Sequence, residues 1–110
     1  MKNSKILINV GWTIFIAQCA DNTLYSGMTR NLKKELIEIE TFKKGRYFCK
    51  NPERLPLRVV YKEDNVPFKE AYAKFNYLRS MTRVQRERLI KTNVWPIGGA
   101  LKRYIEKNLL

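Results

Sequence analysis

The side chains of this sequence with the clearest chemical potential are its lysines and arginines. Together they number 22 against 10 aspartates and glutamates, which gives a formal net charge of +12 at pH 7. Such an excess favours polyanionic partners, because binding releases the counterions that surround a phosphate backbone. The same charge is also typical of a solvated surface that only keeps a small protein soluble. Charge alone therefore indicates a class of partner and not a site.

Two stretches concentrate the basic residues. The first interleaves them with Tyr47 and Phe48, aromatic rings of the kind on which nucleic-acid bases stack. The second lies in residues 79–110, where eight basic side chains stand against two acidic ones. The predicted nucleic-acid-binding residues are Arg30, Lys33, Lys34, Lys43, Lys44, Arg46, Tyr47, Lys50 and Arg54 in the first stretch, with Arg79, Arg83 and Arg86 in the second.

Cysteine and histidine usage excludes one common kind of site. Cys19 and Cys49 are the only cysteines and histidine is absent, so one chain cannot supply the ligands of a structural zinc site. No apolar run reaches the ~20 residues of a membrane-spanning helix, and residues 6–10 are too short for the core of an export signal. We expect a soluble cytoplasmic protein with reduced cysteines, no membrane partner and no cofactor.

The first half of the chain predicts a β-hairpin followed by a helix. Residues 12–19 are rich in aromatic and β-branched side chains, and residues 23–27 resume an extended pattern after Asp21 and Asn22. Because aspartate and asparagine favour tight turns, the two segments are predicted to pair as antiparallel strands. A helix is predicted over residues 32–42, with Asn31 as its N-cap.

The second half predicts one more strand and then helices. Residues 57–61 have the composition of a strand, which we expect to end in a turn at Asp64 and Asn65. A helix follows, and intervals of three and four residues predict that one face of it is buried. Thr82 and Gln85 match a capping box, which starts a further helix. The residues of the predicted buried face are Phe68, Ala71, Tyr72, Phe75 and Leu78.

The domain organisation follows from these elements. We expect residues 1–11 to form an N-terminal arm and residues 12–91 a single domain. Apolar side chains at helical spacing in residues 101–109 predict a final helix. Residues 92–110 are therefore predicted to be a helical extension that packs on the same domain, with Trp95 and Tyr104 docking it rather than stacking on bases.

This order of elements resembles the GIY-YIG endonuclease domain, and particularly its small stand-alone bacterial members. The resemblance rests on Phe15 in the first strand, on Tyr25-Ser26-Gly27 in the second, and on further matches that run to residue 90. It implies an α/β (α+β) fold, with a small three-stranded antiparallel sheet flanked by helices, to which this chain adds a C-terminal helix.

The resemblance also implies where catalytic side chains would fall, and this chain departs from the family at most of them. Members cut phosphodiester bonds with one divalent metal ion. Their helix arginine falls on Glu35, their histidine on Ile39, their metal-binding glutamate on Phe75 and their first tyrosine on Phe15. Phenylalanine offers no oxygen to a hard cation, and a carboxylate repels the phosphate that an arginine attracts. Of the family's set, Tyr25 remains as the candidate catalytic residue, with Tyr47 as a second match, and no metal site is expected.

Three functions fit these residues. The preferred one is a catalytically inactive GIY-YIG-like domain that binds DNA or RNA through phosphate contacts. The second is an active endonuclease whose essential groups have moved, which would need Mg²⁺ or Mn²⁺. The third is an interaction subunit of a ribonucleoprotein or repair complex, which would contact a protein partner through the apolar face of the C-terminal helix. The residues of that face are Leu101, Tyr104, Ile105, Leu109 and Leu110.

Overall fold

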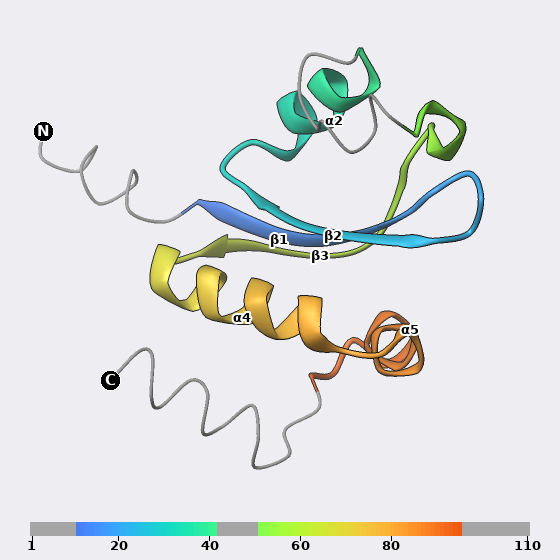
Figure 1. Ribbon diagram of the computed structural model, residues 1–110. Coiled ribbons are helices and arrows are strands. Elements are labelled where there is room, and N and C mark those ends of the chain that lie inside the picture. Colours follow the sequence, from blue (N-terminus) through green and yellow to red (C-terminus); the bar gives the residue numbers. More distant parts are fainter. Residues whose placement is uncertain (1–10, 42–50, 96–110) are drawn as a thin grey trace, which may run out of the picture.

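The computed structural model describes residues 11–41 and 51–95, which form one antiparallel sheet with helices on both of its faces (Figure 1). In Figure 1, helix α2 lies above the sheet and helix α4 below it. The predicted α+β fold with a three-stranded antiparallel sheet is confirmed. The elements in chain order are β1 (Trp12–Gln18), β2 (Leu24–Thr29), α2 (Leu32–Glu40), the 3-10 turn η1 (Pro52–Arg54), β3 (Arg58–Val66), α4 (Phe68–Ser80) and α5 (Arg83–Thr92).

The predicted terminal segments lie almost wholly outside this description. Of the N-terminal arm, residues 1–10 are outside the described residues, and of the C-terminal extension, residues 96–110 and the added helix are outside them. Within the two described ranges, the helices are too short or too polar to cross a membrane.

Strand β1 is the centre of the sheet and is covered on both faces. Its neighbours β2 and β3 both pair with it in antiparallel register. Successive side chains of a strand point to opposite faces, so a strand with both faces covered is expected to be largely apolar. Ile14 and Ile16 pack in the main core cluster with Ala71 of α4, whereas the ring of Phe15 contacts that of Tyr25. Residues 13–17 are accordingly all buried.

The hairpin turn between β1 and β2 forms where the sequence predicts it. Asn22 has a φ of 70°, a left-handed conformation that asparagine tolerates well. The Thr23 hydroxyl donates to Asp21 Oδ1 at 2.6 Å, and this hydrogen bond holds the pKa of Asp21 below its usual value. Arg54 of η1 stabilises the turn, because its guanidinium contacts both Asp21 and Thr23.

Strand β3 is longer than the sequence predicts, and the turn expected at Asp64 and Asn65 is wrong. Both residues belong to the strand, which continues to Val66. Asn65 has a φ of 58°, and the pairing with β1 shifts register at this point. The left-handed asparagine therefore forms a β-bulge instead of a turn. The Thr13 hydroxyl fixes the bulge by donating to Asp64 Oδ1 at 2.8 Å.

The buried face of α4 also differs from the prediction. Ala71 and Leu78 are buried as expected, but Phe68 and Tyr72 are exposed and Phe75 is only half-buried. Spacings of three and four fit more than one stripe along this helix. The stripe of α4 that faces the core contains the small residues Ala71 and Ala73, with the half-buried Lys74 beside them. Its sequence is therefore less hydrophobic than that of the aromatic stripe. The helical spacing and the large apolar rings together therefore favoured the aromatic stripe over the buried one.

Lys74 lies on the inner side of α4 and joins this helix to β3 and to Trp95. Its ammonium contacts Glu63 of β3 and Glu70 of α4, each at 3.0 Å. Burial opposes the charged form, but the hydrogen bonds with Glu70 and Glu63 outweigh it and raise the pKa of Lys74. Trp95 packs against this group, with its ring centroid 5.3 Å from the ammonium and its Nε1 donating to the Tyr61 hydroxyl. Trp95 thus packs against the main core cluster, whereas the C-terminal helix that it is predicted to dock lies outside the described residues.

Both predicted helix starts are observed. Asn31 caps α2 by accepting from the backbone amide of Lys34 at 3.0 Å. Thr82 and Gln85 form the reciprocal capping box of α5. These signals are local, because each involves residues at most three positions apart.

Candidate nucleic-acid interface

Beneath α2, two of the positions where the resemblance expects catalytic groups hold buried apolar side chains. Phe15 is 1% exposed and Ile39 is 0% exposed. Ile39 and Cys19 form a small core cluster against which Tyr25 and two leucines pack. The rings of Phe15 and Tyr25 lie 6.2 Å apart, centroid to centroid. The structure thus brings Phe15, Tyr25 and Ile39 together, as a packed apolar layer.

Phe75 lies on α4, on the opposite face of the sheet from α2 (Figure 1). The prediction that it belongs to the core is wrong, because it is half-buried and lies in neither core cluster. The guanidinium carbon of Arg79 lies 5.4 Å from the centroid of its ring. Across residues 11–41 and 51–95, no three or more histidine, cysteine, aspartate or glutamate side chains gather in a way that could hold a metal ion.

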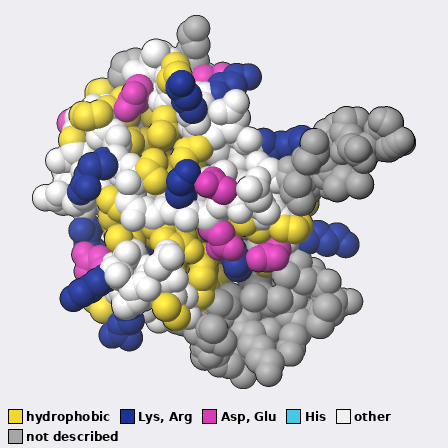
Figure 2. Space-filling model, turned by 180° about the vertical axis from the view of Figure 1, so that it is seen from behind, with side chains coloured by type: hydrophobic (Ala, Val, Ile, Leu, Met, Phe, Trp, Pro, Cys, Tyr) yellow, Lys and Arg dark blue, Asp and Glu magenta, His cyan; other side chains and the backbone are white. Residues whose placement is uncertain are grey.

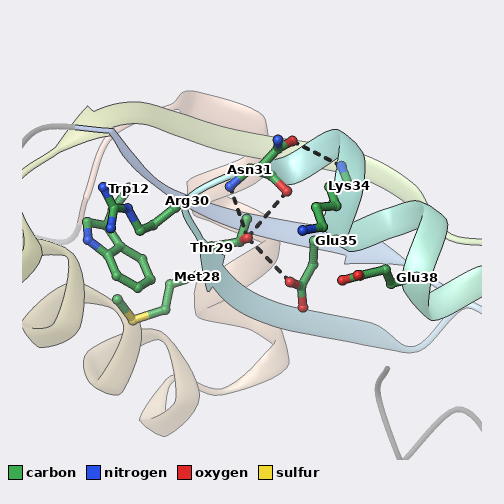
Figure 3. A pocket seen from close by; sticks show the side chains of 8 residues that line it. All are labelled: Trp12, Met28, Thr29, Arg30, Asn31, Lys34, Glu35 and Glu38. Carbon is green, nitrogen blue, oxygen red and sulfur yellow. Dashed lines mark hydrogen bonds between the residues drawn. The ribbon is translucent and has the colours of Figure 1, made fainter. Parts of the chain in front are cut away.

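An open pocket of about 400 Å³ lies at the start of α2 (Figure 3). The Thr29 hydroxyl at its centre accepts from the Asn31 amide and lies 3.3 Å from the Glu35 carboxylate. Two cations and two carboxylates share the pocket, so its charges oppose one another. It is therefore not a simple phosphate clamp. Its lining residues are Trp12, Met28, Thr29, Arg30, Asn31, Lys34, Glu35 and Glu38.

A second pocket, of about 500 Å³, brings together two arginines from different elements. Arg58 comes from β3 and Arg83 from α5, and the pocket between them reaches the hairpin end of the sheet. Arg58 Nη2 donates to Gln18 Oε1 at 2.6 Å, and Arg83 pairs with Glu87 at 2.8 Å. Arg58 is not in the predicted binding set, although the sequence places it near the start of the predicted strand over residues 57–61.

The described members of the predicted basic set lie on different parts of the fold. Arg30, Lys33 and Lys34 lie near the start of α2, whereas Arg79 and Arg83 belong to α4 and α5. Figure 2 shows basic side chains scattered among acidic and hydrophobic ones on the face that it presents. A nucleic acid that contacts all of these cations would have to pass around the edge of the sheet.

Two other members of the set are partly buried. Arg54 contacts the hairpin turn, so its side chain has a structural partner. Arg86 is half-buried, with its Nε shielded from solvent. The remaining predicted residues, Lys43, Lys44, Arg46, Tyr47 and Lys50, lie outside the described residues.

Fold and site together define a small, basic α+β protein with one three-stranded antiparallel sheet. No family model matches the chain. It is nevertheless 32% identical over 79 residues to a UPF0213 protein of Clostridium perfringens, and the match covers 72% of this chain and 82% of that protein. A UPF0213 protein of Syntrophus aciditrophicus is 31% identical over 80 residues, or 73% of this chain and 90% of that protein. The chain belongs to the UPF0213 family.

A solved structure supports the fold. The solution NMR structure of a UPF0213 protein from Bacillus halodurans matches 77% of this chain and 87% of that chain with a TM-score of 0.50. The two sequences are 21% identical, so the match concerns the fold alone. The family name states no activity, and function must be argued from the residues of this chain.

Proposed function

We propose that this UPF0213 protein is a GIY-YIG-like domain that binds DNA or RNA through phosphate contacts and does not cut it. The observation that carries the proposal is the apolar layer beneath α2, in a chain whose net charge is +12. The charge favours a polyanion, and the layer leaves no polar group at two of the positions where a GIY-YIG nuclease acts.

A divalent metal ion, which such nucleases use, does not fit these positions. Magnesium and manganese prefer carboxylate, carbonyl and water oxygens. Phe75 and Ile39 offer none, and Phe15 has no hydroxyl. Glu70, the nearest preceding glutamate on α4, is ion-paired with Lys74 at 3.0 Å. No step of a metal-dependent reaction is therefore assigned to this chain.

The charge excess supports phosphate binding, because the basic side chains outnumber the acidic ones that could pair with them. With 22 basic and 10 acidic residues, 22 − 10 = 12 basic side chains would remain even if every acidic one were paired once. Several acidic groups are used inside the fold, such as Glu63 and Glu70 around Lys74. The exposed Lys33 and Lys34 at the start of α2 are available to contact phosphates beside the pocket of Figure 3.

A salt series of binding measurements tests this proposal. With about four phosphate contacts, log K should fall with log salt at a slope of about −3.6, or roughly a hundredfold between about 50 and 200 mM salt. Fluorescence anisotropy of labelled duplex, branched and single-stranded oligonucleotides gives the affinities. Lys34→Gln should make the slope less steep by about 1.

The matched control is Lys62→Gln, because the Lys62 ammonium already pairs with Asp64 at 3.0 Å. It removes the same formal charge and should change the slope by less than Lys34→Gln does. If none of the three oligonucleotide types binds at low salt, the proposal is wrong.

A further inference from the structure

An exposed aromatic stripe runs along the outer side of α4. At about 100° per residue, Phe68, Tyr72, Phe75 and Arg79 lie within about 60° of one another around the helix. Phe68 is 50% exposed and Tyr72 is 54% exposed. Single exposed apolar side chains are ordinary, but a contiguous row of rings indicates a binding surface.

The stripe continues beyond the helix onto the sheet. The ring centroids of Trp12 and Phe68 lie 5.3 Å apart, and those of Phe68 and Tyr72 lie 5.9 Å apart with an interplanar angle of 22°. The four rings of the aromatic stripe are therefore Trp12, Phe68, Tyr72 and Phe75.

An arginine lies at each end of the aromatic stripe. Arg30 lies beside Trp12, with its guanidinium carbon 6.0 Å from the ring centroid (Figure 3). At the other end, the guanidinium carbon of Arg79 lies 5.4 Å from the centroid of Phe75. The helix rises about 1.5 Å per residue, so Phe68 and Arg79 are about 16 Å apart along α4. This spacing suits a strand with phosphates at both ends of a short run of bases.

We propose that the aromatic stripe binds the unpaired bases of a single nucleic-acid strand, while Arg30 and Arg79 contact its phosphates. The inference rests on the proposed function and names the form of nucleic acid preferred. Duplex bases are stacked on one another and hide their faces, whereas unpaired bases can stack on protein rings. Cations at both ends and the net charge of +12 complement a polyanion better than an apolar protein partner.

The test compares single-stranded and duplex binding in a variant that lacks two rings. Phe68→Ala combined with Tyr72→Ala should weaken the binding of labelled oligothymidine by about tenfold or more, because each stacked base contributes strongly. Binding of a duplex of similar length should change little, and the salt slope should stay the same. The control is Val84→Ala combined with Val94→Ala, which removes two exposed apolar side chains elsewhere on the surface.

A second measurement reports on the stripe directly. Trp12 and Trp95 are the two tryptophans of the chain, so Trp95→Phe leaves Trp12 as the only one. Oligothymidine should quench the fluorescence of Trp12 over the same concentration range in which the anisotropy of the labelled oligonucleotide changes. The same quenching should be weaker when Phe68 and Tyr72 are both alanine.

Other results would overturn this inference. If the double alanine variant binds oligothymidine as wild type does, with a steep salt slope, the stripe is not the base site although the proposed function stands. If wild type binds no nucleic acid, both fail. A wild-type dimer that becomes monomeric in the variant would assign the stripe to a second copy of the chain. A large fall in Tm with unchanged binding would assign it to packing within the chain.

Discussion

Replacing Ile39 by histidine is expected to lower the free energy of unfolding by about 3 kcal/mol, because an imidazole would be buried without a designed partner. Ile39 is 0% exposed and packs with Cys19, Tyr25 and Leu55. Histidine is the residue that the GIY-YIG resemblance expects at this position. The substitution therefore tests whether the position where the resemblance expects a catalytic histidine is part of the core. Urea denaturation followed by circular dichroism measures the change.

Ile37→His is the matched control, since Ile37 is 53% exposed on the same helix. This control substitution should lower the free energy of unfolding by less than about 0.5 kcal/mol. The wild-type chain contains no histidine, so any new pH dependence near the ordinary histidine pKa of about 6.5 belongs to the introduced side chain. Burial disfavours the charged imidazole, and the Ile39→His variant should lose further stability as pH falls below about 6.5. Equal stability of the two variants would contradict the buried position of residue 39.

Gly27→Ala is expected to destabilise the fold by about 1 to 3 kcal/mol through overpacking. A Cβ at position 27 would lie 2.7 Å from Cζ and 2.8 Å from Cε1 of Phe15, closer than carbon atoms pack. Gly27 pairs directly with Phe15 across the β1–β2 ladder, and the Phe15 ring is buried. The glycine is therefore needed because the ring of Phe15 occupies the space where its side chain would be. Thermal and urea denaturation give the magnitude.

A double-mutant cycle separates this contact from a general effect on β2. Phe15→Leu alone should lower the free energy of unfolding by about 1 to 2 kcal/mol. When it is combined with Gly27→Ala, the total loss should be smaller than the sum of the two single losses by about 1 kcal/mol. Ser26→Ala is the control on the neighbouring residue. The Ser26 hydroxyl is buried without a hydrogen-bond partner, so its removal should be close to neutral. Strict additivity of the Gly27 and Phe15 changes would show that the predicted steric contact is absent.

The features that sequence predicted well are those fixed by neighbouring residues. The hairpin turn depends on Asp21 and Asn22, and the starts of α2 and α5 depend on Asn31 and Thr82. In each case, a side chain bonds to backbone or side-chain groups within three positions, so the chemistry is readable from local sequence. The central strand was also predicted, because a run of apolar residues is required where both faces are covered.

The features that sequence missed depend on contacts between distant segments. Lys74 is half-buried on the inner side of α4, where Glu63, on another element, supplies a carboxylate. Asn65 forms a bulge only because β1 continues to pair beyond it. The approach of Arg58 to Arg83 likewise depends on how α5 packs near β3. The candidate site was predicted in part. The sequence shows that basic residues are abundant, but it does not show that they are divided between the two sides of the sheet.

The apolar layer beneath α2 and the aromatic stripe on α4 lie on different faces of the sheet. On the proposed function, the contact with bases lies on the α4 face, away from the positions where the GIY-YIG resemblance expects catalytic groups. The buried Phe15 and Ile39 would then serve stability, whereas the exposed Phe68 and Tyr72 would serve binding. This separation predicts that variants of the two sets affect different measurements.

The central claim is that the chain binds nucleic acid without cutting it, and one measurement tests it most directly. End-labelled duplex, branched and single-stranded substrates are incubated with saturating protein and Mg²⁺ or Mn²⁺ at low salt, and the strands are separated under denaturing conditions. We expect every labelled strand to remain at full length, because Phe75, at the position where the GIY-YIG resemblance expects the metal-binding glutamate, offers no oxygen to a metal ion. Metal-dependent product that disappears in Tyr25→Phe would contradict the account and identify an active endonuclease.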